Sequence, residues 1–194
     1  PPFDNSDVRW ALPLAMDPVS YDTTAYDGAA AINPLPIVVN APQMKEMYIE
    51  PKSAGLQDFT LDLGNGETFK PWDTEAPTRL VEEAWKRGFE FPDDPEIIKT
   101  SFGYGAWKYA PDAAAKLLVK SGFTQDTDGK WLLPDGTPWQ FIVYTDTIPG
   151  RWPYQNAQAA YVEWRKFGID VRFEVGEAGQ LRIQTGDFDV TGGQ

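Results

Sequence analysis

The chain contains no cysteine and no histidine in its 194 residues. It can therefore form no disulfide, thiolate metal site or thiol nucleophile, and a nucleophile–base pair would need serine, lysine or carboxylates. None of its serines lies in a G-x-S-x-G elbow. The 29 Asp and Glu residues leave open a carboxylate pair of the kind that hydrolyses glycosides. We nevertheless expect no enzyme activity and no cofactor, and any metal site would have to use oxygen ligands alone.

Long apolar runs and an excess of positive charge are also missing. No uninterrupted apolar run reaches the ~18 residues that span a membrane. The first ten residues, PPFDNSDVRW, lack the basic and apolar regions of a signal peptide, so we expect a domain excised from a longer protein. The formal net charge of −12 would repel phosphate backbones, which argues against a nucleic-acid partner.

The acidic stretch Asp126-Thr-Asp128-Gly129 resembles the start of a calcium-binding loop. Such a loop needs Gly at its sixth position and Glu at its twelfth. Here these positions hold Trp131 and Thr137. We therefore interpret the stretch as a turn that leads into a hairpin.

Hydrophobic residues make up 42% of the chain, which predicts a sizeable core, whereas 17 prolines and 17 glycines predict long connections. Pro111 before an apolar helical face, with Gly122 after it, predicts a helix. Two apolar runs, 130–133 and 139–144, flank Pro134-Asp135-Gly136, which predicts an antiparallel hairpin.

The next segment has the pattern of a helix followed by a strand. Apolar residues recur at helical spacing over 157–167 and end at Gly168. Residues 169–175 then alternate between apolar and charged, as in a strand with one buried face. Together with the strand expected to begin near Trp139, this helix and strand form a strand–helix–strand unit. Such a unit predicts a right-handed parallel crossover.

The first half of the chain has weaker patterns. An amphipathic helix is predicted to begin near Ser6, to be bent or delayed by Pro13 and to stop at Pro18. Residues 21–105 form a loop-rich, irregular region, and 21–40 are predicted to be a loop.

Within this region, the pattern predicts a few short elements. They are short strands over 37–39 and 56–63, the second ending in a tight turn at Asn65-Gly66, a helix from Pro77 to Gly88, and one helical turn over 96–100.

Tryptophan is abundant, with eight copies. Trp85 and Trp164 occur at helical spacing among apolar residues, so we expect both in the core. Trp152 lies instead in the loop after the 141–144 strand, and open α/β sheets bind ligands outside the carboxyl ends of their strands. The candidate cleft residues are therefore Tyr144, Thr145, Asp146, Arg151 and Trp152, the alternative being a plain surface loop.

The carboxyl-terminal residues provide further candidates. Gly186-Asp-Phe-Asp189 and the residues after it predict a strand, and Gly192 and Gly193 would allow close backbone approach to a ligand. Arg182 on the preceding segment and the terminal Gln194 complete the set of ligand-binding candidates, with a plain surface charge as the alternative for Arg182.

Three blocks of the sequence, at residues 3–17, 114–138 and 159–193, resemble the second lobe of family 5 extracellular solute-binding proteins. These are the peptide, nickel and oligosaccharide receptors of ATP-binding-cassette (ABC) importers. Pro13 and Pro18 depart from the family's usual first helix, and residues 21–105 match its pattern poorly.

The resemblance implies an α/β fold, namely one lobe of a type II periplasmic-binding protein with a mixed sheet and flanking helices, over residues 1–194. It also implies a peptide or small solute as ligand, the N-terminal lobe and an ABC permease as partners, and a periplasmic or extracellular, membrane-associated location. An oligosaccharide receptor of the same family, a free-standing carbohydrate-binding module and a glycoside hydrolase fragment remain alternatives.

Overall fold

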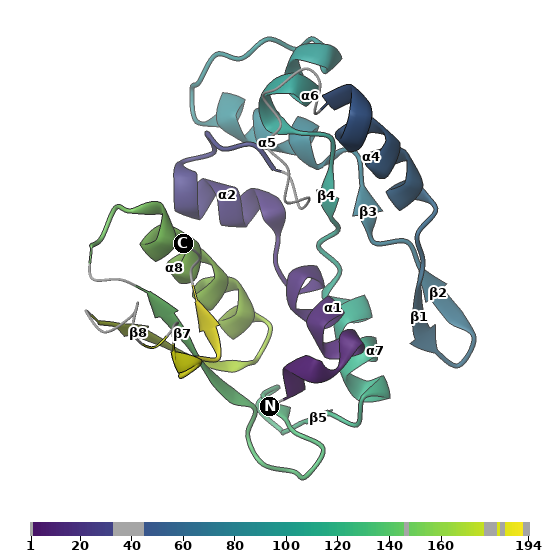
Figure 1. Ribbon diagram of the computed structural model, residues 1–194, viewed down its shortest axis with the longest axis vertical. Coiled ribbons are helices and arrows are strands. Elements are labelled where there is room, and N and C mark those ends of the chain that lie inside the picture. The colour runs from purple at the N-terminus through teal and green to yellow at the C-terminus, as the bar shows by residue number, and fades with distance from the viewer. Residues whose placement is uncertain (1, 33–44, 146–147, 177–181, 183–184, 192–194) are drawn as a thin grey trace.

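The computed structural model describes residues 2–32, 45–145, 148–176, 182 and 185–191 of the chain (Figure 1). Its helices are η1 (Pro2–Asp4), α1 (Ser6–Leu14), α2 (Pro18–Tyr26), the π-helix η2 (Lys45–Ile49), α4 (Glu50–Gln57), α5 (Ala76–Lys86), α6 (Pro95–Phe102), α7 (Pro111–Lys120) and α8 (Trp152–Lys166). Its strands are β1 (Leu61–Gly64), β2 (Glu67–Phe69), β3 (Trp72–Asp73), β4 (Ala106–Trp107), β5 (Thr124–Gln125), β6 (Trp131–Leu132), β7 (Gln140–Thr145), β8 (Asp170–Val175) and β9 (Val190–Thr191).

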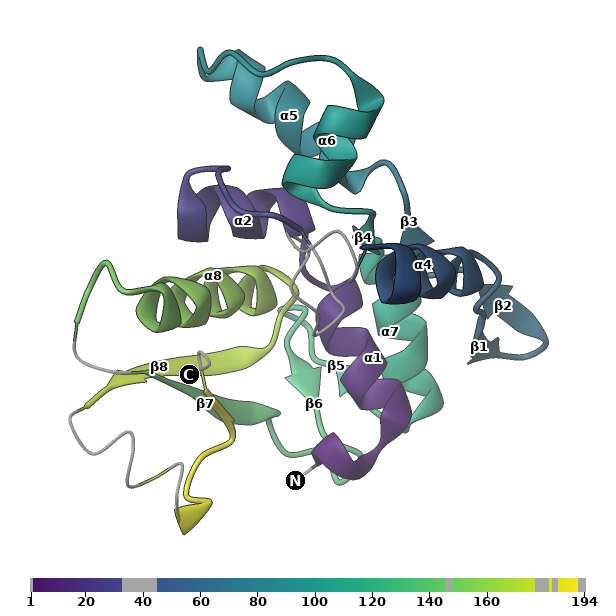
Figure 2. The ribbon, with the colours of Figure 1, turned by 45° about the horizontal axis from the view of Figure 1, so that its top comes forward.

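The two longest strands, β7 and β8, form a three-stranded parallel sheet with the short β9, in the order β8–β7–β9. Val143 on the central strand pairs with Phe173 on one side and Val190 on the other. Helix α8 covers one face of this sheet, and α2 packs on the outer side of α8 (Figure 2). The predicted strand–helix–strand unit and its parallel pairing are confirmed.

The predicted helix after Pro111 is confirmed as α7, which buries its apolar face and is followed by Gly122 at φ +87°. The predicted hairpin is only partly correct. β6 pairs antiparallel with β5, and just one bridge, Leu132 to Pro138, joins the two predicted arms among the described residues. The reason is local: Asp126, in the turn between β5 and β6, accepts the N–H groups of Asp128 and Lys130, and this turn places β6 beside β5.

The prediction of a loop from residue 21 is wrong at its start, because α2 spans Pro18–Tyr26. Pro18 begins this helix: it occupies the first turn, where a missing N–H costs nothing, and Asp17 accepts the N–H of Val19 at 3.0 Å. The strand predicted over 37–39 lies outside the described residues.

The short elements of the first half are confirmed in part. The strand predicted over 56–63 begins only at Leu61, because Leu56 belongs to α4. The tight turn is confirmed, with Asn65 at φ 53° and Gly66 at φ 78° between β1 and β2. The predicted helix after Pro77 is α5, and the turn predicted over 96–100 is part of α6.

Two hydrophobic cores lie in the described residues. The main core joins α1, α7 and β1 to the parallel sheet and α8. A smaller one, the α5–α6 core, consists of Leu80, Val81, Ile98 and Phe102, with Val19, Ile32 and Phe91 packed against it. The expected mixture of helices and strands is therefore found, and the described residues lack the mainly β scaffold of a free-standing carbohydrate-binding module.

The two tryptophans that were expected in the core differ. Trp164 is 6% exposed and its indole N–H donates to the carbonyl of Leu12 at 3.0 Å, which confirms the prediction. Trp85 is 41% exposed, so its prediction is wrong. Its indole donates to the carbonyl of Phe91 at the open edge of the α5–α6 core, where no further element of the described chain covers it.

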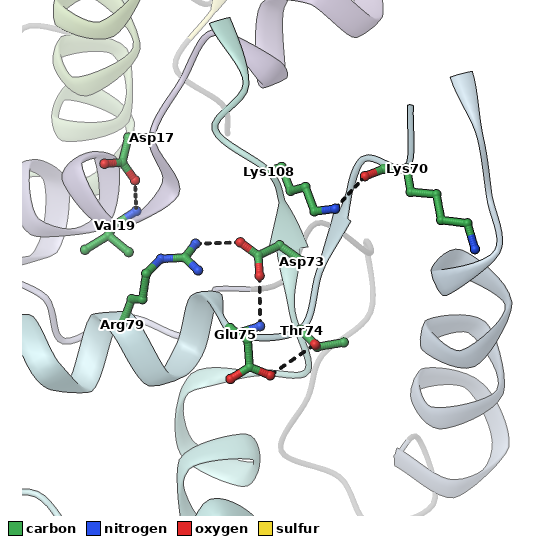
Figure 3. Close-up of polar contacts among 8 residues, drawn as sticks. All are labelled: Asp17, Val19, Lys70, Asp73, Thr74, Glu75, Arg79 and Lys108. Atoms are coloured by element: carbon green, nitrogen blue, oxygen red, sulfur yellow. Dashed lines mark hydrogen bonds and ion pairs between the residues drawn. The ribbon is translucent and has the colours of Figure 1, made fainter. Parts of the chain in front are cut away.

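Polar contacts attach α5 to the rest of the molecule (Figure 3). Asp73, at the end of β3, accepts the N–H of Glu75 at 2.9 Å and binds the guanidinium of Arg79 at 2.5 Å. Arg79 also interacts with the charge of Asp17, which caps α2. One arginine thus connects the start of α5 with β3 and α2.

Candidate ligand-binding surface at the carboxyl end of the parallel sheet

Parallel pairing brings the carboxyl ends of β7, β8 and β9 to the same edge of the sheet. Tyr144 lies opposite Glu174 on β8 and Thr191 on β9, and Thr145 lies opposite Val175. Ligands of open α/β sheets bind outside this edge. The strand register therefore gathers Tyr144, Thr145 and Glu174 where a ligand is expected.

Arg182 joins this group from a segment much later in the chain. Its guanidinium lies over the ring of Tyr144, 5.0 Å from the ring centre. It also forms long ion pairs with the carboxylates of Glu174 and Asp187, both at 3.8 Å. The structure thus brings together two of the predicted residues, Tyr144 and Arg182, and adds two carboxylates that the sequence did not single out.

Tyr144 itself is only 4% exposed. Gly176, just beyond β8, lies so close that a Cβ atom there would collide with the tyrosine hydroxyl. Its N–H donates to the carbonyl of Thr145 at 3.3 Å. The backbone just after β8 therefore covers the hydroxyl of Tyr144. The guanidinium of Arg182 lies above the ring, and the side chain of Arg182 is 37% exposed.

Thr145 is 3% exposed, and its hydroxyl has no hydrogen-bond partner within the described part of the chain. Buried polar atoms without a partner are uncommon, because each one loses its hydrogen bonds to water. A polar ligand atom that reached this hydroxyl would restore one such bond.

Arg151 and Trp152 lie at the start of α8, the helix that follows β7. Both side chains are exposed, Trp152 by 52%, and Arg151 has extended backbone before the helix begins. Since β7 and α8 are consecutive, both residues lie on the side of the sheet where β7 ends. The remaining predicted residues, Asp146, Gly192, Gly193 and Gln194, lie outside the described residues.

Sequence reasoning missed Glu174, Gly176 and Asp187. Glu174 was assigned only to the polar face of its strand. Aligning the ends of the two parallel strands would have placed it beside Tyr144, but that alignment requires the register. Asp187 was assigned to the strand predicted from Gly186, but that strand begins only at Val190, as β9, and residues 186–189 are irregular. Gly176 follows β8 in a stretch without a periodic pattern.

The acidic stretch at 126–129 is a turn, as predicted. One carboxylate oxygen of Asp126 accepts the backbone N–H groups of Asp128 at 2.9 Å and of Lys130 at 2.8 Å. Across the described ranges, no group of three or more acidic side chains could hold a metal ion. None of the helices there is long and apolar enough to cross a bilayer.

Comparison with known proteins gives a consistent result. The family model for the bacterial extracellular solute-binding proteins, family 5 middle region, matches residues 1–194. No curated protein matches the sequence. Among solved structures, a periplasmic oligopeptide-binding protein of an ABC transporter from Thermotoga maritima is similar at 20% identity with a TM-score of 0.56, over 97% of this chain and 26% of that chain.

Further structures share the fold. The oligopeptide-binding protein OppA is similar at 19% identity and TM-score 0.54, over 97% of this chain and 21% of its own. NikA from Brucella suis, solved with Fe(III)-EDTA, is similar at 18% identity and TM-score 0.54, over 96% and 26%. The Thermotoga protein has also been solved with mannohexaose bound. This chain therefore spans about a quarter of the length of the solved proteins that it matches.

Proposed function

The chain belongs to the bacterial extracellular solute-binding proteins of family 5, and we propose that it forms one lobe of a two-lobed receptor that captures an oligopeptide or similar solute for an ABC importer. The other lobe is the N-terminal lobe of the same protein. The receptor acts outside the cytoplasm and delivers its solute to a permease in the membrane.

The mechanism of this proposal is hinge closure and involves no chemical step. Ligand contacts from both lobes favour the closed state by their differential affinity for it. This chain supplies the contacts of one lobe, through the carboxyl edge of its parallel sheet. The site is made of Tyr144, Thr145, Asp146, Arg151, Trp152, Arg182, Gly192 and Gln194, to which we add Glu174 and Asp187.

The observation that carries the peptide assignment is the arrangement of charges around Arg182. Its ion pairs with Glu174 and Asp187 are long, and the side chain of Asp187 is 76% exposed. Such pairs contribute little energy, so a ligand can replace them at small cost. A peptide carries both an ammonium and a carboxylate group, which complement the carboxylates and the guanidinium respectively.

An oligosaccharide is the second candidate, and exposed aromatic rings favour it. Trp152, at the start of α8, is 52% exposed, and Phe188, two residues before β9, is 38% exposed. Neutral sugars stack on such rings without needing a charge partner. The mannohexaose complex of the Thermotoga protein supports this second assignment.

Calorimetry distinguishes these possibilities. We expect the chain alone to bind tri- to pentapeptides and manno-oligosaccharides weakly or undetectably, because it provides the ligand contacts of only one of the two lobes. In the full-length receptor, Arg182→Ala should weaken peptide binding by about tenfold or more, since hydrogen bonds to charged groups are the stronger ones. The control Lys86→Ala, on α5, should leave it unchanged.

Each result has a definite meaning. Sugar binding without peptide binding by the full-length receptor would favour the second candidate. Micromolar peptide binding by the chain alone would show that the site is complete without a partner lobe. Binding of neither class, or equal effects of the Arg182 and Lys86 substitutions, would contradict the proposed site.

A further inference from the structure

A cavity lies away from the candidate ligand-binding surface, between the α1–α2 corner and β4. Its volume is about 280 Å³. Its walls come from α1, α2, residues 30–32 and β4. The described residues that line it are Pro13, Met16, Pro18, Tyr21, Asp22, Tyr26, Ala30, Ala31, Ile32, Ala106 and Trp107.

Asp22 is the only charged side chain among these lining residues. It is 4% exposed, and one of its carboxylate oxygens has no hydrogen-bond partner among the described residues. The backbone of Ala30 donates a hydrogen bond to the carboxylate. The nearby Tyr26 hydroxyl is engaged elsewhere, because it donates to the side-chain oxygen of Asn156 at 2.6 Å.

A buried carboxylate with an unpartnered oxygen is costly unless a cation or a hydrogen-bond donor reaches it. Burial raises the pKa of the Asp22 carboxyl to about 7, so the group is partly ionised at neutral pH. The surrounding walls are aliphatic or aromatic, and the rings of Tyr21 and Trp107 can also attract a cation. Together these features define both an anionic point and an apolar enclosure.

We propose that this cavity binds a small organic cation that has a primary ammonium group on an apolar or aromatic body. The ammonium donates to the unpartnered oxygen of Asp22, and the body lies against Met16, Tyr21 and Trp107. The cavity is near the lower limit of about 300–1,000 Å³ for small-molecule pockets, which restricts the ligand to a compact molecule.

This site is distinct from the surface at the carboxyl edge of the sheet. None of the residues that line the cavity belongs to that surface, and binding here requires no partner lobe. The inference therefore does not rest on the proposed receptor function, and a failure of one leaves the other intact.

The test compares two probes of nearly equal shape on the 194-residue chain by calorimetry at pH 8. The probes are phenethylammonium and the neutral 2-phenylethanol. We expect the ammonium to bind about tenfold or more tightly than the alcohol, because it forms a charge-assisted hydrogen bond. Asp22→Asn keeps the side-chain shape but removes the charge, and it should abolish this difference.

Two further variants secure the interpretation. Asp27→Asn changes an exposed carboxylate just after the same helix and should leave both affinities unchanged. Ala30→Leu adds volume to the cavity wall and should weaken both probes. Thermal unfolding of each variant confirms that it remains folded.

Several outcomes would overturn the proposal. They are no phenethylammonium binding by the unaltered chain up to millimolar concentration, equal affinity for the ammonium before and after Asp22→Asn, and unchanged binding of both probes by Ala30→Leu. Equal affinity of the unaltered chain for the two probes would likewise reject a cation site in favour of a purely apolar one.

Discussion

The main core and the α5–α6 core of this molecule are built differently. The main core draws its buried residues from elements at both ends of the chain, including α1, α7, β7, α8 and β8. The α5–α6 core has four buried residues from two consecutive helices and lies at the far end of the molecule from the parallel sheet (Figures 1 and 2). In the main core, segments distant in the sequence bury one another. The α5–α6 core is small, and it depends on contacts of α5 with α2 and β3.

The attachment of the smaller core shows this dependence. α5 contacts α2, and Arg79 at its start binds Asp73 (Figure 3). The ring of Trp85, at the edge of the α5–α6 core, remains 41% exposed. Since hydrophobic burial stabilises in proportion to the apolar area removed from water, we expect α5 and α6 to open at lower free energy than the sheet and its helices.

The largest expected effect compares one leucine in each core, both fully buried. Leu117→Ala in α7 should reduce the free energy of unfolding by about 4 kcal/mol, through lost burial and the cavity that remains. Leu80→Ala in α5 should mainly accelerate amide hydrogen exchange in α5 and α6, with smaller changes in α7 and α8. Equal loss of protection throughout the molecule after either substitution would show that the two cores unfold as one unit.

The second prediction concerns the pH dependence of stability at α2, the helix that contacts both α8 and α5. Burial raises the pKa of Asp22 from 3.8 to about 7. Its stabilising contribution is therefore complete below pH 4 and is lost as the pH rises through 7. About 1.4 kcal/mol per pKa unit sets a ceiling near 4 kcal/mol for this loss.

Asp22→Asn should remove this loss, because asparagine does not ionise. The measurement is urea unfolding from pH 4 to pH 8, with Asp27→Asn as the control. Tyr21 and Tyr26 also interact with Asp22, but burial raises the pKa of both phenols, so they stay neutral over this range. If the unaltered chain and Asp22→Asn lose stability in parallel, the carboxyl of Asp22 is not the group responsible.

The smallest expected effect compares two tryptophans with the same local sequence pattern. Trp164→Phe removes a buried indole, its hydrogen bond to Leu12 and part of its contact with Phe141, and should cost about 1.5 kcal/mol. Trp85→Phe changes a half-exposed ring and should cost less than about 0.5 kcal/mol. Chemical denaturation measures both, and similar losses would mean that the α5–α6 core matters as much to global stability as the main one.

Much of the second half of the fold could be predicted from the sequence. α7, α8 and β8 have strong periodic patterns, the two helices with clear glycine stops, and the structure has all three, although α8 begins at Trp152, before the predicted residue 157. α2 was missed because a proline that ends one helix can equally begin the next. The arm at 130–133 was paired only with the strand after its turn, whereas it also pairs with β5 before it, because turn residues alone do not show which of two adjacent turns carries the longer pairing.

The candidate site shows the same division. The end of a predicted strand placed Tyr144 and Thr145 at the end of β7, whereas Trp152, which was predicted in a loop, is the first residue of α8. The placement of Arg182 over the ring of Tyr144 and between Glu174 and Asp187 could not be predicted, because these residues come from separate segments. Nor could the burial of Asp22, since it depends on α1, residues 30–32 and β4 closing around one helix.

The sequence by itself determined the local elements with regular periodicity, the family resemblance and the absence of thiol and imidazole chemistry. These depend on residue identity and on spacing along the chain. Only the tertiary structure decided the pairing of strands, the exposure of Trp85 against the burial of Trp164, and the isolation of the Asp22 carboxylate. Burial and charge pairing depend on which distant segments meet, and that information is not present in any single stretch of sequence.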